Sequence, residues 1–312
     1  MAAIDCGTNA IRLLVAEVDE AGILHERVRE LRTVRLGEGV DRTGEFSEAA
    51  LQRTFAACDE YARIIDGLGA GPIRFVATSA SRDVSNRAAF VAGVHARLGI
   101  EPEVIAGAEE AELSFLGAVR GLPQAPTSPA LIVDIGGGST EFVLGSLIGE
   151  SWHLDRSISV DIGCVRMTER HLHGDPPTAA QVAQVQSDIA AALAQVRAKV
   201  PVEQARSLVG LAGTVTTMAA MALGLPRYDA ELQHGATMTS AEVGQVAAAL
   251  LAMTRAERAQ LPFMHPGRVD VIGGGALILD AIMEQFDMDR VIVSECDLLD
   301  GIVYRLQAAS FR

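Results

Sequence analysis

The sequence predicts an α/β protein of two domains with related topology, and three observations support this prediction. Its 312 residues, 49% of them hydrophobic, can bury a larger core than one domain usually holds. Strand-like apolar runs alternate with helical patterns, which indicates largely parallel sheets. A strand–Asp–x–Gly–strand pattern occurs at 1–16 and again at 130–145, as expected for a duplicated domain. We expect domains at 1–124 and 125–312.

The first predicted domain begins with a β-meander. Apolar runs separated by turn residues fill positions 2–36, which is typical of antiparallel strands joined by short turns. Ser47 then opens a helical pattern that ends at Gly67 or Gly69. A strand, a helix, a second strand and a second helix follow, at 73–78, 86–98, 101–107 and 108–122.

The second predicted domain follows a linker at 122–130, which has three prolines in nine residues. It repeats the strand–turn–strand opening of the first domain. Two later stretches, 208–224 and 269–286, each predict a strand, a glycine turn and a helix. The remaining elements are a strand near 151–160, a helix at 164–173, a long helix opened by Thr178, and a closing strand and helix at 290–306.

Composition and charge exclude several classes of protein. The formal net charge of −14 argues against an extended nucleic-acid surface and against an anionic membrane partner. Polar residues interrupt the first apolar stretch, so we expect no targeting segment or membrane span and a cytoplasmic location. The four cysteines are far apart and form no CxxC, which predicts neither a disulfide framework nor a zinc site.

Four glycine-bearing stretches are candidates for phosphate binding: "DCGTN", "DIGGGST", "GLAGTVTT" and "GGGALI". Glycine lets a ligand approach backbone N–H groups closely, although most glycine turns are simply hairpins or helix caps. None matches a P-loop or a complete GxGxxG. Asp5 and Asp134 precede two of these turns at matching positions, and a carboxylate would repel a phosphate. A divalent cation such as Mg²⁺ removes that conflict, because it binds carboxylates and phosphate oxygens together.

A helix that starts near Gly107 carries Glu109, Glu110 and Glu112 in its first turns. Acidic residues there complement the helix dipole, which is a sufficient structural reason for them. The functional alternative is that one glutamate acts as general base on a water molecule. Hydroxyl groups and arginines near 8–12 and 78–82 are candidate phosphate clamps, although a single arginine is often only a solvated surface charge.

Taken together, the motifs resemble those of the exopolyphosphatase / guanosine pentaphosphate phosphohydrolase (Ppx/GppA) phosphatase family in its short two-domain form. The resemblance rests on "AAIDCGTNAIRLLVAE", "VATSASRDVSN", "VIAGAEEAELSFLGAV", "LIVDIGGGSTEFVLG", "DIGCVRMTERHL" and "VIGGGALILDAIMEQFDMDRVIVSECDLLDGI", which occur in order across nearly the whole chain. It implies the duplicated actin-like ATPase (ribonuclease H-like) fold, with two domains flanking a cleft and the last helix packing back on the first domain.

The resemblance also implies an activity and a set of site residues. It predicts Mg²⁺-dependent hydrolysis of the terminal phosphoanhydride of polyphosphate, or of the 5′-γ-phosphate of guanosine pentaphosphate. Glu110 matches the catalytic base, while Asp134 and Glu141 match acids that position the metal and the attacking water. The matching phosphate contacts are Thr8, Asn9, Arg12 and Arg82 in the first domain and Gly136, Gly137, Gly138 and Ser139 in the second.

Two departures from the family pattern and three alternative functions remain. Ala10 stands where many members have serine, and the chain ends one helix after "SECDLLDGI", where longer members continue with a helical domain. We therefore expect short polyphosphate chains to be favoured. The alternatives are a guanosine pentaphosphate phosphohydrolase, a superfamily kinase with ATP at "GLAGTVTT" and "VIGGGALI", and a non-catalytic protein that binds guanosine tetraphosphate. A homodimer is compatible with the resemblance, since relatives often dimerise.

Overall fold

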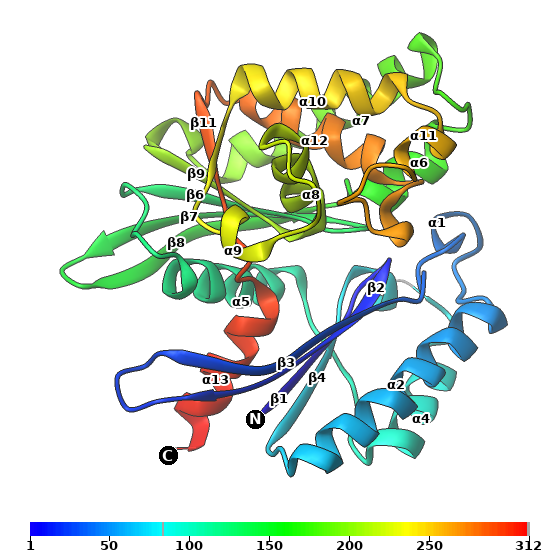
Figure 1. Ribbon diagram of the computed structural model, residues 1–312, viewed down its shortest axis with the longest axis vertical. Coiled ribbons are helices and arrows are strands. Elements are labelled where there is room, and N and C mark those ends of the chain that lie inside the picture. Colours follow the sequence, from blue (N-terminus) through cyan, green and yellow to red (C-terminus); the bar gives the residue numbers. More distant parts are fainter. Residues whose placement is uncertain (83, 311–312) are drawn as a thin grey trace. The chain divides into compact units, whose positions relative to one another are not determined.

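The computed structural model describes residues 1–82 and 84–310, which form two compact α/β units (Figure 1). The first unit contains Met1–Gly117 together with the C-terminal stretch that begins at Leu298. The second unit contains Ala118–Asp297. Each unit has its own mixed sheet and its own hydrophobic core.

The boundary between the units differs from the predicted division into 1–124 and 125–312. It falls after Gly117, inside helix α5 (Gly107–Gly121), and not in the proline-rich linker. No proline interrupts the helix at the boundary: α5 continues to Gly121, and the next proline in the chain is Pro123. The predicted domains also take in residues 83, 311 and 312, which lie outside the described residues.

The sheet of the first unit has the strand order β3-β2-β1-β4-β5. The first three strands are antiparallel neighbours, so the predicted β-meander is confirmed. Strand β4 pairs parallel with β1 and with β5, which is the expected result of helical crossovers between strands. The predicted strand at 101–107 is only two residues long. The bounds are β1 (Ala2–Cys6), β2 (Ala10–Val18), β3 (Leu24–Thr33), β4 (Ile73–Ala77) and β5 (Glu103–Val104).

Helices cover both faces of this sheet, which explains why all five residues of β1 are buried. On one face, Ile4, Ile11 and Leu13 belong to the same apolar cluster as Phe55 and Phe90. Ser47 caps α2 through its hydroxyl group, as predicted. The helices of the first unit are α1 (Val40–Thr43), α2 (Glu48–Leu68), α3 (Ser79–Arg82), α4 (Arg87–Leu98), α5 and α13 (Leu298–Ser310).

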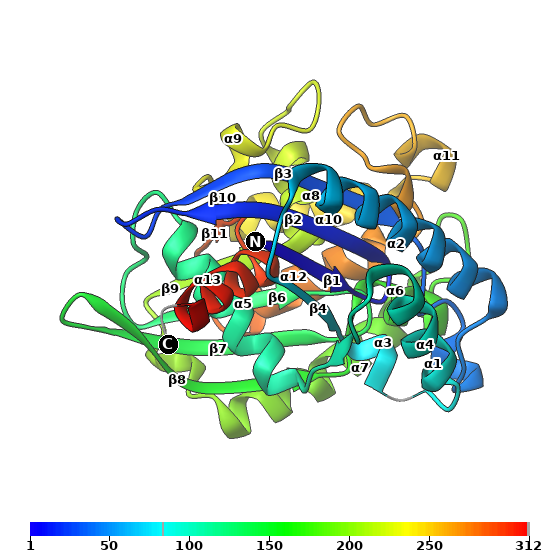
Figure 2. The same ribbon diagram turned by 90° about the horizontal axis from the view of Figure 1, so that it is seen from below.

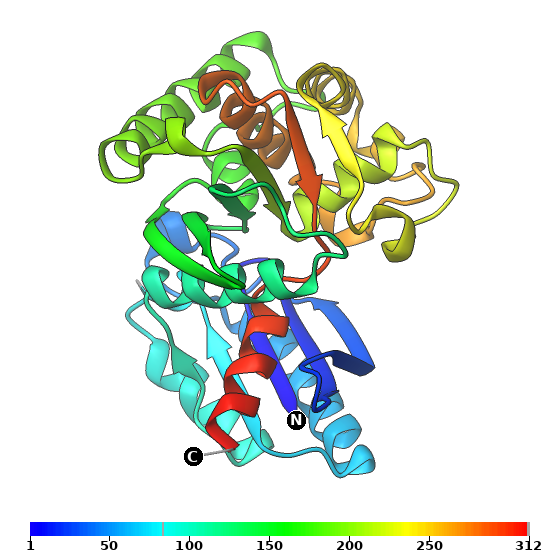
Figure 3. The same ribbon diagram turned by 90° about the vertical axis from the view of Figure 1, so that its left-hand side faces the viewer.

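The last helix, α13, packs on the other face of this sheet, beside β1 and β2 (Figure 3). Asp300 on α13 is almost fully buried and accepts a hydrogen bond from Arg29 Nη2 on β3 at 2.7 Å. Gly301 lies against the backbone of α5, since a Cβ on this residue would be 2.0 Å from the carbonyl oxygen of Leu113. An ion pair and a close helix contact therefore fix α13 to the first unit.

The sheet of the second unit has the order β10-β11-β9-β6-β7-β8, with β6, β7 and β8 as an antiparallel meander (Figure 2). Strand β9 pairs parallel with β6 and with β11, so three strands end at the same edge of the sheet. The bounds are β6 (Ala130–Ile135), β7 (Thr140–Ile148), β8 (Ser151–Val160), β9 (Ser207–Leu211), β10 (Thr237–Thr239) and β11 (Arg290–Val293).

Helices of the second unit pack their apolar residues against this sheet in one continuous core. Thr178 and Gln181 form a capping box at the start of α7, which confirms the predicted helix there. None of the described helices is long and apolar enough to cross a membrane. The helices are α6 (Cys164–His171), α7 (Ala179–Lys199), α8 (Ala212–Ala222), α9 (Ala230–Gln233), α10 (Ser240–Ala252), α11 (Arg255–Arg258) and α12 (Ile272–Gln285).

The predicted strand and glycine turn at 269–286 are wrong, because the three glycines lie inside the first turn of α12. They are buried against other helices. A Cβ on Gly274 would lie 2.7 Å from the hydroxyl oxygen of Thr168, and one on Gly275 would lie 2.3 Å from that of Thr214. These glycines allow α12 to pack closely on α6 and α8, a reason that no local pattern contains.

The contact between α13 and α5 predicts that Gly301→Ala destabilises the first unit. Alanine is the better helix former, but its Cβ would collide with the Leu113 carbonyl group, and overpacking of this kind costs about 1–3 kcal/mol. We expect Tm to fall in a thermal unfolding experiment. Gly67→Ala is the matched control: Gly67 is exposed on helix α2 with no atom near its Cβ position, so Tm should stay the same or rise. A Gly301→Ala variant as stable as Gly67→Ala would contradict this packing.

Candidate active site

The two units begin with the same hairpin, which confirms the predicted repeat. In the first, the N–H of Gly7 donates to the carbonyl oxygen of Ala10 at 2.9 Å; in the second, Gly136 donates to Ser139 at 3.0 Å. The strands then pair in the same register, with Asp5 opposite Arg12 and Asp134 opposite Glu141.

The loop between β6 and β7 is fastened through its carbonyl groups to the start of helix α6. The carbonyl oxygen of Gly136 accepts from the N–H of Cys164 at 3.0 Å. That of Gly137 accepts from two successive N–H groups of the helix, at 2.9 and 3.1 Å. The carbonyl oxygen of Gly138 accepts from the side chain of Arg166, with Nε at 2.7 Å. Three consecutive carbonyl groups of the loop thus point toward α6.

This fastening determines where the N–H groups of the loop point. A trans peptide is planar, so its N–H points away from its C=O. The N–H groups of Gly137, Gly138 and Ser139 therefore face away from α6, side by side. Successive N–H groups directed to one side form a concave site for an anion such as a phosphate oxygen. The structure thus gives the predicted phosphate loop a suitable orientation.

Gly163, directly before α6, is required for this close approach. A Cβ there would lie 2.4 Å from the carbonyl carbon and oxygen of Gly137. Next in the chain, Cys164 is buried, and burial raises the pKa of its thiol to about 11. The thiol therefore remains protonated at neutral pH and provides no thiolate nucleophile.

Asp134 and Glu141 form a buried pair of acids beside the loop. They stand opposite each other on β6 and β7, and their residues are 8% and 1% exposed. The Ser159 hydroxyl group lies 2.7 Å from Glu141 Oε1 and donates to it. Like charges on directly opposite strand positions repel each other, so this pairing costs stability on its own.

The first unit shows the balanced version of the same pair. Asp5 stands opposite Arg12, and Arg12 Nη2 lies 2.6 Å from Asp5 Oδ2. In the second unit Glu141 takes the place of Arg12, so two carboxylates that could bind a cation stand opposite each other. Mg²⁺ binds one or two protein carboxylates together with phosphate oxygens, and Asp134 and Glu141 fit that requirement. Among the described residues, no group of three or more His, Cys, Asp or Glu is arranged to hold a metal ion by itself.

The carboxyl ends of β1, β4 and the short β5 bring the predicted residues of the first unit to one edge of its sheet. Thr8, after β1, has its hydroxyl group 3.0 Å from that of Ser79, after β4. Arg82 on α3 and Glu110 on α5 form an ion pair, with Nη1 and Oε2 2.7 Å apart. Crevices at the carboxyl ends of parallel strands are the usual ligand sites of α/β sheets.

The three glutamates at the start of α5 have different surroundings. Glu109 pairs with Arg74 at 2.6 Å and Glu112 pairs with Arg305 at 2.8 Å, and both side chains are about half exposed. The Glu110 side chain is only 11% exposed. The first two therefore have ordinary surface ion pairs, which distinguishes Glu110 as the candidate for a chemical role.

The turn that carries Thr8 and Asn9 is held by the segment after β3. The Asn9 carbonyl oxygen accepts from the N–H of Arg35 at 2.8 Å, and the Thr8 carbonyl oxygen accepts from the N–H of Gly37 at 2.8 Å. A Cβ on Gly37 would lie 2.3 Å from the Thr8 methyl group. Arg12, another predicted phosphate contact, is bound to Asp5 through both Nε and Nη2, so its role toward phosphate stays a prediction.

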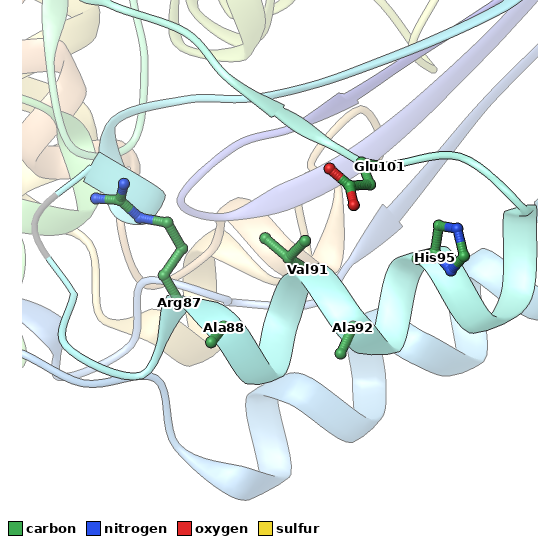
Figure 4. A pocket seen from close by; sticks show the side chains of 6 residues that line it. All are labelled: Arg87, Ala88, Val91, Ala92, His95 and Glu101. Carbon is green, nitrogen blue, oxygen red and sulfur yellow. The ribbon is translucent and has the colours of Figure 1, made fainter.

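A surface pocket of about 530 Å³ lies elsewhere in the first unit, along α4 (Figure 4). None of the predicted site residues lines it. At one end, the guanidinium group of Arg87 donates to the carbonyl oxygen of Arg82. The pocket is lined by Arg87, Ala88, Val91, Ala92, His95 and Glu101.

Each unit thus collects its own share of the predicted residues at the carboxyl edge of its sheet. The first brings together Thr8, Asn9, Arg12, Arg82 and Glu110, and the second Asp134, Glu141 and the loop 136–139. Sequence reasoning missed three participants: Ser159, Gly163 and Arg166. The signal for the last two was a glycine directly before a helix, in "DIGCVR".

Comparisons with known proteins agree with this geometry. The family model described as "Ppx/GppA phosphatase family" matches residues 14–309. Exopolyphosphatase 2 of Mycobacterium tuberculosis is 48% identical, and the match covers 98% of each chain. A guanosine-5′-triphosphate,3′-diphosphate pyrophosphatase of Aeromonas salmonicida is 28% identical over 98% of this chain and 59% of its own length.

Solved structures give the same result. The crystal structure of an exopolyphosphatase-like protein has a TM-score of 0.94 and 42% identity, and the match covers 100% of this chain and 98% of that one. The predicted duplicated actin-like fold is confirmed by the two mixed sheets and by two solved structures of Ppx/GppA proteins from Aquifex aeolicus, each with a TM-score of 0.80 and with 28% and 31% identity. The chain belongs to the Ppx/GppA phosphatase family, and it is a phosphoanhydride hydrolase.

Proposed function

We propose that this protein is a Mg²⁺-dependent exopolyphosphatase that releases terminal phosphate and favours short polyphosphate chains. The observation that carries the proposal is the buried acid pair Asp134 and Glu141 beside a loop whose N–H groups face away from α6. N–H groups that can bind an anion, next to two buried carboxylates, suit a ligand that combines a divalent cation with phosphate oxygens. Exopolyphosphatase 2 of Mycobacterium tuberculosis, similar over nearly the whole chain, supports the same substrate class.

In the proposed reaction the protein orients the terminal phosphate and the attacking water. The N–H groups of Gly137, Gly138 and Ser139 bind oxygens of the phosphoryl group, and Arg82, Thr8 and Asn9 contact phosphates of the chain. Glu110 accepts a proton from the attacking water molecule while the oxygen of that water forms the new bond to phosphorus. The bond to the bridging oxygen breaks, and the shortened chain leaves with that oxygen. Positioning and charge stabilisation account for most of the catalysis of phosphoryl transfer.

Asp134 and Glu141 are the residues that would hold Mg²⁺. When bound, the ion would neutralise charge on the phosphate oxygens. Ser159 orients the Glu141 carboxylate through its hydroxyl group. The Arg82–Glu110 ion pair likewise holds the proposed base in one orientation.

Guanosine pentaphosphate is the alternative substrate. Its 5′-terminal phosphoanhydride requires the same chemistry, and the Aeromonas salmonicida relative is named for a guanosine substrate of this kind. The kinase alternative loses support, because it needs ATP at the glycines of α12, and these are buried against α6 and α8.

Phosphate release from short polyphosphate, long polyphosphate and guanosine pentaphosphate, each with Mg²⁺, tests the proposal. We expect the highest kcat/KM for short polyphosphate. A higher value for guanosine pentaphosphate would reassign the substrate. Tight binding of guanosine tetraphosphate with no turnover of any of the three would instead indicate a non-catalytic binding protein.

The base role predicts that Glu110→Gln lowers kcat by about 10²- to 10⁴-fold, because glutamine cannot accept the proton. Binding of short polyphosphate should change little, as measured by calorimetry with Mg²⁺. Glu112→Gln is the matched control, since it removes a carboxylate from the same helix at an exposed ion pair. Its rate should remain at the wild-type level. Near-wild-type turnover of Glu110→Gln would exclude this residue as the base.

The acid pair predicts a specific effect of Asp134→Asn on metal binding. Mg²⁺ at roughly 100 times its Kd should stabilise the wild type by about 2.7 kcal/mol, seen as a rise in Tm. The variant should lose that rise, because Mg²⁺ prefers carboxylate ligands and the substitution removes one of the two.

Asp5→Asn is the matched control at the equivalent position of the first unit. It removes the partner of Arg12 and should therefore lower Tm with and without metal. The Mg²⁺-dependent rise should be retained. If both variants keep the rise, or both lose it, Asp134 does not have the proposed metal role.

A further inference from the structure

The loop at 136–139 depends on one side chain that the proposed chemistry does not use. Arg166 on α6 donates through Nε to the carbonyl oxygen of Gly138 at 2.7 Å, and its own backbone N–H donates to the carbonyl oxygen of Gly137 at 3.1 Å. One residue thus holds two consecutive peptide groups of the loop. Its side chain is 18% exposed, and its Nη2 lies 3.9 Å from Oδ1 of the largely exposed Asp161.

The side-chain bond is the one that controls the last peptide of the loop. The carbonyl groups of Gly136 and Gly137 are held by backbone N–H groups of α6, which every residue except proline provides. The carbonyl group of Gly138 is held by Arg166 Nε, a donor that depends on the residue type. The same peptide carries the N–H of Ser139, which must face away from α6 to reach a phosphate.

Glycine lowers the resistance of this peptide to rotation on one of its two sides. A half-turn of the Gly138–Ser139 peptide changes ψ of Gly138 and φ of Ser139. Without a Cβ, Gly138 offers little steric resistance to its share of this rotation. After such a rotation the Gly138 carbonyl oxygen would replace the Ser139 N–H on the phosphate side and would repel the anion. An anchoring hydrogen bond from α6 prevents this.

We propose that Arg166 is a positioning residue that keeps the Ser139 N–H directed at the terminal phosphate. This inference rests on the function proposed above. Arg166 acts through the Gly138 carbonyl group and not by binding the phosphate. Its effect therefore depends on the hydrogen bond donated by the side-chain Nε, and the positive charge of the guanidinium group contributes little to holding the loop.

Three substitutions separate the hydrogen bond from the charge. Glutamine has its amide nitrogen at the same distance along the side chain as arginine Nε, so Arg166→Gln keeps a donor there and loses the charge. Lysine has a carbon at that position and keeps the charge beyond it. Methionine has neither a donor nor a charge.

The experiment measures two quantities for wild type and the three variants: the affinity for inorganic phosphate in the presence of Mg²⁺, and kcat/KM for short polyphosphate. Loss of one preorganised donor typically lowers a rate by about 10²- to 10³-fold. We expect losses of about that size in kcat/KM for Arg166→Met and Arg166→Lys, with weaker phosphate binding. Arg166→Gln should stay within about fivefold of wild type in both quantities.

Other outcomes would overturn the inference. Rescue by lysine but not by glutamine would show that charge matters and that Arg166 acts on the phosphate directly. Wild-type values for all three variants would show that the anchor is unnecessary. Losses that follow a fall in Tm would indicate a merely structural role. A wild-type protein that binds phosphate but releases none from any substrate would disprove the proposed function, while the binding series would still test Arg166. Absence of phosphate binding would refute both.

Discussion

The attachment of the loop carbonyl groups to helix α6 is the constraint on which the rest of the candidate site depends. The carbonyl groups of three consecutive peptides accept hydrogen bonds from α6 on one side of the loop. Because each peptide is planar, the three N–H groups point to the other side. Gly163 is needed because the helix approaches the loop more closely than a Cβ allows. The glycines of "DIGGGST" therefore allow the loop backbone to approach the start of α6 closely, in addition to leaving room for a phosphate.

The repeated hairpin shows how one scaffold supports two different electrostatic solutions. In the first unit the residue opposite the aspartate is Arg12, and the two form an ion pair with Arg12 Nη2 2.6 Å from Asp5 Oδ2. In the second unit the same position is Glu141, so two buried acids face each other. The shared register thus places an ion pair in one unit and a pair of carboxylates, the ligand type that Mg²⁺ prefers, in the other.

Much of the fold could be predicted from local pattern, because alternation, helical spacing and capping residues act over short distances. The meander at 2–36, the cap at Ser47 and the capping box at Thr178 are examples. The candidate residues in the loop and at Glu110 could be predicted from motifs and family resemblance. Arg166 could not, since its role depends on a helix 28 residues away from Gly138 in the chain folding back onto the loop. The packing of α13 on the first unit could be expected only from the family resemblance and not from local pattern, because its contact joins Arg29 and Asp300, which are 271 residues apart.

The error at α12 has an instructive physical cause. Glycine is required wherever something approaches a backbone closely, and the sequence does not say what approaches. At Gly136–Gly138 the neighbour on one side is α6, and the opposite side presents N–H groups; at Gly274 and Gly275 the side chains of Thr168 and Thr214 occupy the space instead. What separates the two cases is the place of the preceding aspartate: Asp134 lies near the end of buried strand β6, two residues before Gly136, whereas Asp270 lies in a turn before α12. An acid in a buried strand needs either an ion-pair partner, as Asp5 has in Arg12, or a bound cation; opposite Asp134 stands a second acid, which favours the cation and marks this glycine stretch as the one where chemistry determines the residue.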